Sequence, residues 1–131
     1  MKFNLLMIFL FMISCEYNEL FTGCTEPNAA NYDPSATIDD GNCFFIDDDC
    51  ITQPSFVACV KPIIDNNCVS CHSYGGSANF LILSDYNSIK SAVQNNNLLY
   101  SIENNMPPNG LMSEQNISII KNWIENEMPN N

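Results

Sequence analysis

The residues best suited to chemistry in this chain of 131 residues lie together in one pentapeptide. Cys68 and Cys71 are separated by two residues, and His72, the only histidine of the sequence, follows directly. Two thiols at this spacing can each add across a vinyl group of a haem, and the adjacent imidazole can then bind the iron from one side. The pattern Cys-x-x-Cys-His therefore predicts one covalently attached c-type haem.

Two other kinds of site fit the same cysteines less well. A structural zinc site needs four Cys or His ligands, whereas the remaining cysteines lie upstream at irregular spacing and no second histidine exists. A thioredoxin-like redox pair is expected where a strand meets a helix in a βαβ unit, and the sequence has no such pattern. Haem attachment is thus the favoured interpretation, and a redox pair or a plain disulfide is the main alternative.

The second axial ligand of such a haem must be a methionine, a weaker donor or no residue at all, because His72 is the only histidine. A thioether suits haem iron and raises its reduction potential. Met106 stands between two asparagines and two prolines and belongs to no helical apolar stripe, so we predict that it is the ligand. Met112 is expected to make an apolar contact, and Met128, close to the C-terminus, ranks last.

Helical periodicity begins after residue 54. The first helix is expected to lead into the haem motif, with Pro62 kinking or restarting it. Its core residues recur at intervals of three and four: Phe56, Cys59, Val60, Ile63 and Ile64.

Three further helices are predicted from caps and apolar stripes. Ser84 is the expected N-cap of a helix over 85–94, a short helix covers 98–103, and Ser113 caps a last helix that ends near residue 127. The expected stripes are Tyr86, Ile89 and Val93, then Ile117, Ile120 and Ile124, with Trp123 packing on or near the haem edge.

The start of the chain has the features of an export signal. Lys2 precedes an apolar run of nine residues, 5–13, which is shorter than the ~20 residues that a membrane-spanning helix needs. Cys15 follows Ser14 and resembles the acylated cysteine of bacterial lipoproteins. We therefore expect an exported protein that a lipid on Cys15 anchors to a membrane of the cell envelope, at its periplasmic face or in the outer membrane. The alternative is ordinary signal cleavage with Cys15 in a disulfide.

The remaining cysteines are even in number. Besides Cys15 and the haem pair, the sequence contains Cys24, Cys43, Cys50 and Cys59. An oxidising compartment would join them in two disulfides. Pairing of nearest neighbours gives Cys24 with Cys43 and Cys50 with Cys59, and two other connectivities stay open.

Residues 15–53 are rich in turn formers and lack a helical period, so we predict an irregular, disulfide-closed module. Its stretch 23–43 resembles a short cysteine-bounded repeat of exported bacterial proteins. Asp33, Asp39 and Asp40 offer oxygen ligands for calcium, but their spacing differs from that of an EF-hand loop. A solvated acidic turn is the simpler interpretation of these carboxylates.

The charge of the chain restricts its partners. Without residues 1–14, Lys61, Lys90 and Lys121 are opposed by fifteen Asp and Glu, a net charge of −12. Such a surface repels phosphates, so nucleic acid is not an expected partner. A redox partner protein with a basic docking patch is the natural complement, although an acidic face can also be merely solvated.

Three motifs besides the pentapeptide carry a family resemblance: Leu-x-Leu-Ser-x-Tyr at 81–86, Met-Pro-Pro-x-Gly at 106–110, and Trp-Ile at 123–124. With them, residues 54–131 resemble a class I mono-haem cytochrome c domain. The resemblance implies an all-α domain around one haem c, held by Cys68 and Cys71 and ligated by His72 and Met106. The chain has no arginine, so haem propionates would depend on lysine, amide, Tyr or Trp donors.

The expected organisation is a signal segment at 1–14, the module at 15–53 and the cytochrome-like domain at 54–131. The expected function is one-electron transfer by an electron carrier that is not an enzyme. Two other classes stay open. One is a haem-based sensor or small-gas binder with a vacant or displaceable sixth ligand, and the other is a surface binding module at 23–43 with an accessory haem domain.

Overall fold

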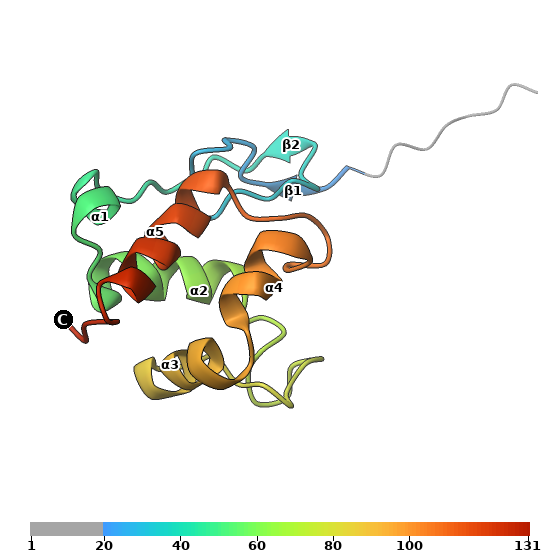
Figure 1. The fold of residues 1–131 in the computed structure, drawn as a ribbon. Coiled ribbons are helices and arrows are strands. Elements are labelled where there is room, and N and C mark those ends of the chain that lie inside the picture. The colour runs from blue at the N-terminus through green and yellow to red at the C-terminus, as the bar shows by residue number, and fades with distance from the viewer. Residues whose placement is uncertain (1–19) are drawn as a thin grey trace, which may run out of the picture.

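A computed structural model describes residues 20–131, so the predicted signal segment and Cys15 lie outside the described residues. Helices predominate in the described part (Figure 1). They are α1 (Asp49–Thr52), the π-helical turn η1 (Phe56–Val60), α2 (Lys61–Asn67), α3 (Tyr86–Asn95), α4 (Leu98–Asn104) and α5 (Glu114–Glu125). Helix α5 packs against α1, η1 and α4, and α3 packs against α4.

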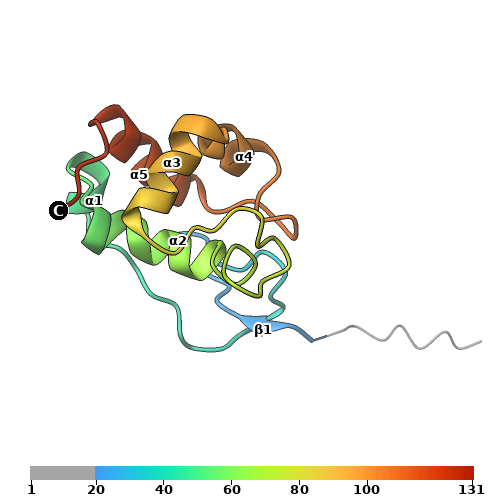
Figure 2. The same ribbon diagram turned by 90° about the horizontal axis from the view of Figure 1, so that it is seen from below.

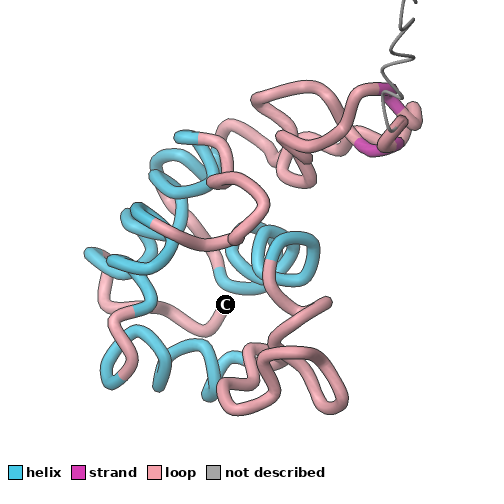
Figure 3. The backbone as a smooth tube through the Cα atoms, turned by 90° about the vertical axis from the view of Figure 1, so that its right-hand side faces the viewer, coloured by secondary structure: helices cyan, strands magenta, loops and turns pink. Residues whose placement is uncertain are grey.

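The predicted all-α class needs a correction in the N-terminal module. Strands β1 (Thr22–Gly23) and β2 (Ile38–Asp39) pair in parallel, with Thr22 opposite Ile38. A disulfide between Cys24, which directly follows β1, and Cys43, four residues after β2, holds the two strands close to one another. The strand pair and α3 lie at opposite ends of the molecule (Figure 1), and Figure 3 shows the strands beyond the group of helices.

Pro62 lies just after the point where η1 passes directly into α2, in the segment where the sequence predicts a kink or a restart of the helix. The wide turn η1 ends at Val60, and α2 begins at Lys61 with the proline in its first turn, where a missing N–H costs no helical hydrogen bond. The Ser55 hydroxyl caps η1 by accepting from the Ala58 N–H at 3.1 Å. All five predicted core residues of this segment are buried. Helix α2 ends at Asn67, so the Cys-x-x-Cys-His motif lies in turns after the helix and not within its last turns.

The N-cap of α3 is Asp85, one residue after the predicted Ser84. The Asp85 carboxylate accepts from the backbone N–H groups of Asn87 and Ser88, at 2.9 and 3.1 Å. In return the Ser88 hydroxyl accepts from the Asp85 N–H at 3.1 Å, which completes a capping box. These hydrogen bonds hold the pKa of Asp85 below its usual value, with the Ser88 N–H as the largest cause.

The buried face of α5 is rotated from the predicted stripe. It contains Ile119, Ile120 and Trp123 together with an amide, Asn116, whereas Ile117 and Ile124 are only half-buried. Ser113 caps the helix as predicted, by accepting from the Asn116 N–H at 3.2 Å. Periodicity counted over apolar residues misses this face because one of its four positions is polar.

An aromatic cluster joins three elements and holds the C-terminal tail. The ring of Phe56 lies 5.1 Å from that of Tyr86 and 5.7 Å from that of Trp123. The Trp123 indole N–H donates to the Pro129 carbonyl at 2.9 Å, and the Tyr86 hydroxyl donates to the Met128 carbonyl at 2.8 Å. The C-terminal residue lies against η1, because the Val57 N–H donates to the Asn131 carbonyl at 3.0 Å, and Figure 2 shows the C-terminus on the same side of the molecule as α1.

Candidate functional site

The described residues enclose a cavity of about 740 Å³, a size usual for small-molecule and cofactor sites. All four predicted haem residues line it: Cys68, Cys71, His72 and Met106. The Cys-x-x-Cys-His segment and the loop before α5 thus face the same space, although they are more than thirty residues apart in the sequence.

Backbone hydrogen bonds shape the Cys-x-x-Cys-His segment. The Cys68 N–H still bonds to the Ile64 carbonyl of α2 at 2.9 Å. The Cys68 carbonyl then accepts from both the Cys71 N–H, at 3.1 Å, and the His72 N–H, at 2.8 Å. The Cys68 carbonyl thus closes two successive turns of the backbone. Because only two residues separate the cysteines, these turns bring both thiols and the imidazole to the same cavity.

The ring of His72 is oriented by a backbone carbonyl. Its Nδ1 lies 2.9 Å from the Leu81 carbonyl oxygen. A carbonyl can only accept, so Nδ1 carries the proton of the neutral ring and the lone pair is on Nε2. This is the arrangement in which an imidazole binds a metal through Nε2 while its other nitrogen is held by an outer partner.

Cys68 and Cys71 are free thiols, in contrast to the four cysteines upstream. Burial raises the pKa of the Cys68 thiol to about 12, and the nearby Asp65 carboxylate and Cys71 add to the shift. Cys68 is therefore a neutral thiol at physiological pH, with little tendency to act as a thiolate before any covalent bond forms.

Of the three candidate methionines, Met106 and Met112 line the cavity and Met128 does not. Met112 is 5% exposed and belongs to the core, in agreement with its predicted role as an apolar contact. Met106 is 38% exposed and lies outside any helix, with its N–H bonded to the Ser101 carbonyl at the end of α4. The side chain of Met106 is therefore less involved in core packing than that of Met112.

Trp123 does not line the cavity, and its expected position near a haem edge stays a prediction. It is fully buried and packs instead on Phe56 and Tyr86. Sequence reasoning also missed a group of cavity residues in the N-terminal module, Asn31, Tyr32, Asp33 and Pro34. No local signal marks them, because they are brought to the cavity by tertiary packing.

Both predicted disulfides are confirmed, and with them the pairing of nearest neighbours. Cys24 bonds to Cys43 and Cys50 bonds to Cys59, with Cα atoms 5.0 and 5.6 Å apart. Two disulfides fit an oxidising, exported environment. No helix within residues 20–131 is both long enough and apolar enough to cross a membrane.

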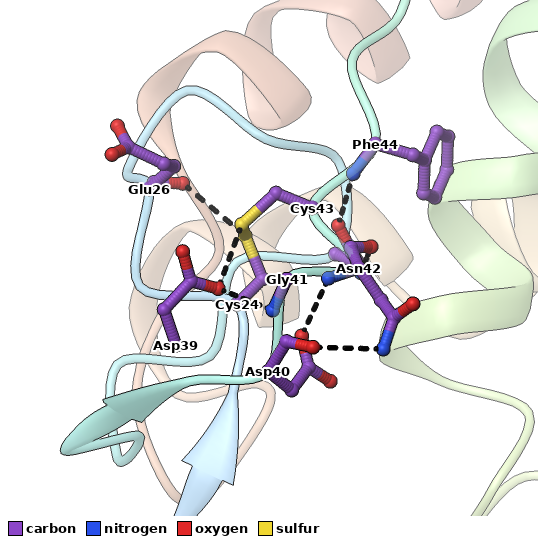
Figure 4. The surroundings of a disulfide bond; sticks show 9 residues. Cys24, Glu26, Asp39, Asp40, Gly41, Asn42, Cys43 and Phe44 are labelled. Atoms are coloured by element: carbon purple, nitrogen blue, oxygen red, sulfur yellow. Dashed lines mark hydrogen bonds between the residues drawn. A yellow bond between two sulfur atoms is a disulfide. The ribbon is translucent and has the colours of Figure 1, made fainter.

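The carboxylates considered for calcium stabilise turns. Asp33 accepts from the Ser35 N–H at 2.9 Å, Asp39 from the Gly41 N–H at 3.0 Å, and Asp40 from the Asn42 N–H at 2.9 Å. Figure 4 shows the last two beside the Cys24–Cys43 disulfide. In the described part of the chain, no three His, Cys, Asp or Glu side chains are grouped as a metal site would require.

Comparison of the chain with protein-family models finds no match, and searches of curated proteins and of solved structures find none either.

Proposed function

We propose that this protein is a mono-haem c-type cytochrome that transfers single electrons in the cell envelope. The observation that supports this most directly is that Cys68, Cys71, His72 and Met106 line one cavity of cofactor size. A redox pair or a plain disulfide would account for the two thiols, but neither would account for an imidazole with Nε2 free and a thioether on the same cavity.

Each of these residues has a separate role in the proposal. The thiols of Cys68 and Cys71 hold a haem by two thioether bonds, which prevents its loss outside the cell membrane. His72 would offer Nε2 as a ligand of the iron, and its hydrogen bond to the Leu81 carbonyl fixes the plane of the ring. Met106 offers its sulfur as the other ligand. A bound haem would supply the one-electron couple, and the residues that line the cavity would influence its potential.

The proposed setting follows from charge and from the start of the chain. A lipid on Cys15 would tether the protein to a membrane surface, where a redox partner with a basic patch would meet its acidic face. The described residues do not include Cys15, so the anchor belongs to the proposal.

The first test is to export the full chain in a host that contains the machinery for c-type haem attachment. We expect a coloured protein whose mass exceeds that of residues 15–131 by one haem and by the acyl groups on Cys15. A variant with Cys68→Ala and Cys71→Ala should be colourless. The matched control, Cys50→Ser with Cys59→Ser, removes two other cysteines and should keep the haem.

Correctly exported material that is colourless, with no added haem mass, would contradict the proposal. Carbon monoxide separates the carrier from a haem-based sensor. Rapid, tight binding of carbon monoxide by the reduced protein would favour a sensor with a displaceable Met106, whereas a carrier should bind it weakly.

A further inference from the structure

The stretch between Gly23 and Cys43, here called the cysteine-bounded module, forms part of the wall of the candidate cavity. Four consecutive residues, Asn31 to Pro34, line it together with His72 and Met106. The module is therefore a component of the proposed site, and not a separate appendage to it.

The disulfide and the backbone hold these four residues in place within the module. The Cys24–Cys43 bond closes the segment, and the Asp33 N–H donates to the Cys24 carbonyl at 2.9 Å. Gly23 passes so close to Asp33 that a Cβ on Gly23 would lie 3.2 Å from a carboxylate oxygen. The position of residues 31–34 thus depends on Cys24 and on its disulfide bond.

One carbonyl of the module links α2 and α5, the two helices next to the segments that contain the proposed ligands. The Ala30 carbonyl accepts from the side-chain amide of Asn67, at 2.9 Å, and from that of Asn116, at 3.0 Å. Asn67 is the last residue of α2, directly before Cys68, and Asn116 lies in the first turn of α5, after the Met106 loop. Ala30 and Asn116 are buried, so water cannot easily replace these side-chain hydrogen bonds to the Ala30 carbonyl.

The module also touches the loop that contains Met106. Gly110 has a φ of +146°, and a Cβ at this position would lie 2.2 Å from Cγ of Pro34. Only glycine allows both this backbone conformation and this approach. Gly110 is four residues after Met106, so Pro34 supports the loop from the side of the module.

From these contacts we infer that the cysteine-bounded module is the positioning element for the Met106 loop. It fixes that loop relative to the Cys-x-x-Cys-His segment through the Ala30 carbonyl and the contact of Pro34 with Gly110. The inference rests on the proposed function in one respect, namely that Met106 is a ligand. The positioning of the loop itself can be measured without a haem signal.

The test removes the disulfide of the module in the full, exported chain by Cys24→Ser with Cys43→Ser. We expect amide hydrogen exchange at Met106 and Gly110 to rise by at least about tenfold, because the loop loses its support. The haem should stay attached, but the sulfur-to-iron charge-transfer absorption should fall by more than half. The control, Cys50→Ser with Cys59→Ser, removes a disulfide from the core. It should lower the stability of the whole fold but leave the sulfur-to-iron absorption unchanged, and it should not raise exchange at Met106 and Gly110 more than exchange in the rest of the chain.

A second pair of variants keeps both disulfides. Gly110→Ala should produce the same changes, and adding Pro34→Gly should restore part of the absorption by removing Cγ. Gly41→Ala is the control, because Gly41 also has a positive φ, of +73°, but a Cβ there meets no atom within 4 Å. Unchanged exchange and absorption in both Cys24→Ser/Cys43→Ser and Gly110→Ala would overturn the inference while leaving the haem proposal intact. Faster loop exchange in a colourless protein would support the positioning role and overturn the haem proposal.

Discussion

Met106 and Met112 both line the cavity, yet their environments differ. Met106 is on a loop and 38% exposed, whereas Met112 is packed in the core. We expect Met106→Ala to keep the haem attached, to abolish the sulfur-to-iron absorption and to lower the reduction potential, because a thioether stabilises the ferrous state. Visible spectroscopy and a redox titration measure both effects.

Met112→Ala is the matched control for this change. It should keep the absorption but lower the free energy of unfolding by about 2–5 kcal/mol, as expected when a buried methionine is truncated. The opposite result, in which Met112→Ala removes the band and Met106→Ala retains it, would transfer the ligand role to Met112.

The buried thiol of Cys68 gives the chain without haem a distinctive response to alkali. Its pKa is raised from 9.0 to about 12 in the fold, so the folded state keeps a proton that the unfolded state loses. The stabilisation is complete below pH 9 and is lost as the pH rises towards 12. Within this window the free energy of unfolding should fall by up to about 1.4 kcal/mol per pH unit.

Denaturant unfolding of the haem-free chain between pH 7 and 11 measures this slope. Cys68→Ser should flatten it, and so should haem attachment, because a thioether sulfur does not titrate. A coloured protein in which Cys68 still titrates would show that this cysteine is not bonded to the haem.

At the level of elements, the hydrogen bond from Tyr86 on α3 to the Met128 carbonyl fixes the C-terminal tail against the core. Tyr86→Phe keeps the aromatic contacts and removes only the hydroxyl, so it should lower the free energy of unfolding by about 1 kcal/mol and accelerate proteolysis of the tail. Tyr100→Phe, at a residue that is 63% exposed, is the control and should change little. Equal effects of the two variants would refute the role of this hydrogen bond.

The elements also show what a sequence can predict and what it cannot. The helices after residue 54, the Ser113 cap and the role of Pro62 were predictable because each depends on neighbours within a few positions. The buried Asn116 was not, because its partner, the Ala30 carbonyl, is 86 residues away in the sequence. The cap of α3 was misplaced by one residue because Ser84 and Asp85 are both good caps, and only the partnership with Ser88 selects Asp85.

The same distinction applies to the candidate site. Cys68, Cys71 and His72 were identified by local spacing, and Met106 by its unusual surroundings in the sequence. The contribution of Asn31 to Pro34 to the cavity was not predictable, since it depends on how the cysteine-bounded module packs onto α2 and α5. The tryptophan-isoleucine motif at Trp123 lies in a helix as expected, but the motif gave no information on which side of that helix the cavity lies.

For the whole molecule, the dominant property is its negative charge, −12 without residues 1–14, and this should govern the encounter with redox partners. The acidic residues include the exposed triplet Asp47, Asp48 and Asp49 at the start of α1. At an ionic strength of about 0.01 M the screening length is about 30 Å, and at 0.15 M it is about 8 Å. Long-range attraction of a cationic partner should therefore be strong only in the first condition.

Small inorganic oxidants of opposite charge test this in stopped-flow experiments on the reduced, haem-loaded protein. Raising the ionic strength from about 0.01 to 0.15 M should slow oxidation by a cationic complex and accelerate oxidation by an anionic one, because screening weakens attraction in one case and repulsion in the other. Asp47→Asn with Asp48→Asn should make both dependences shallower while leaving the reduction potential unchanged. If both oxidants responded to salt in the same direction, the net field of the protein would not control the encounter, and a basic docking patch on the partner would lose its justification.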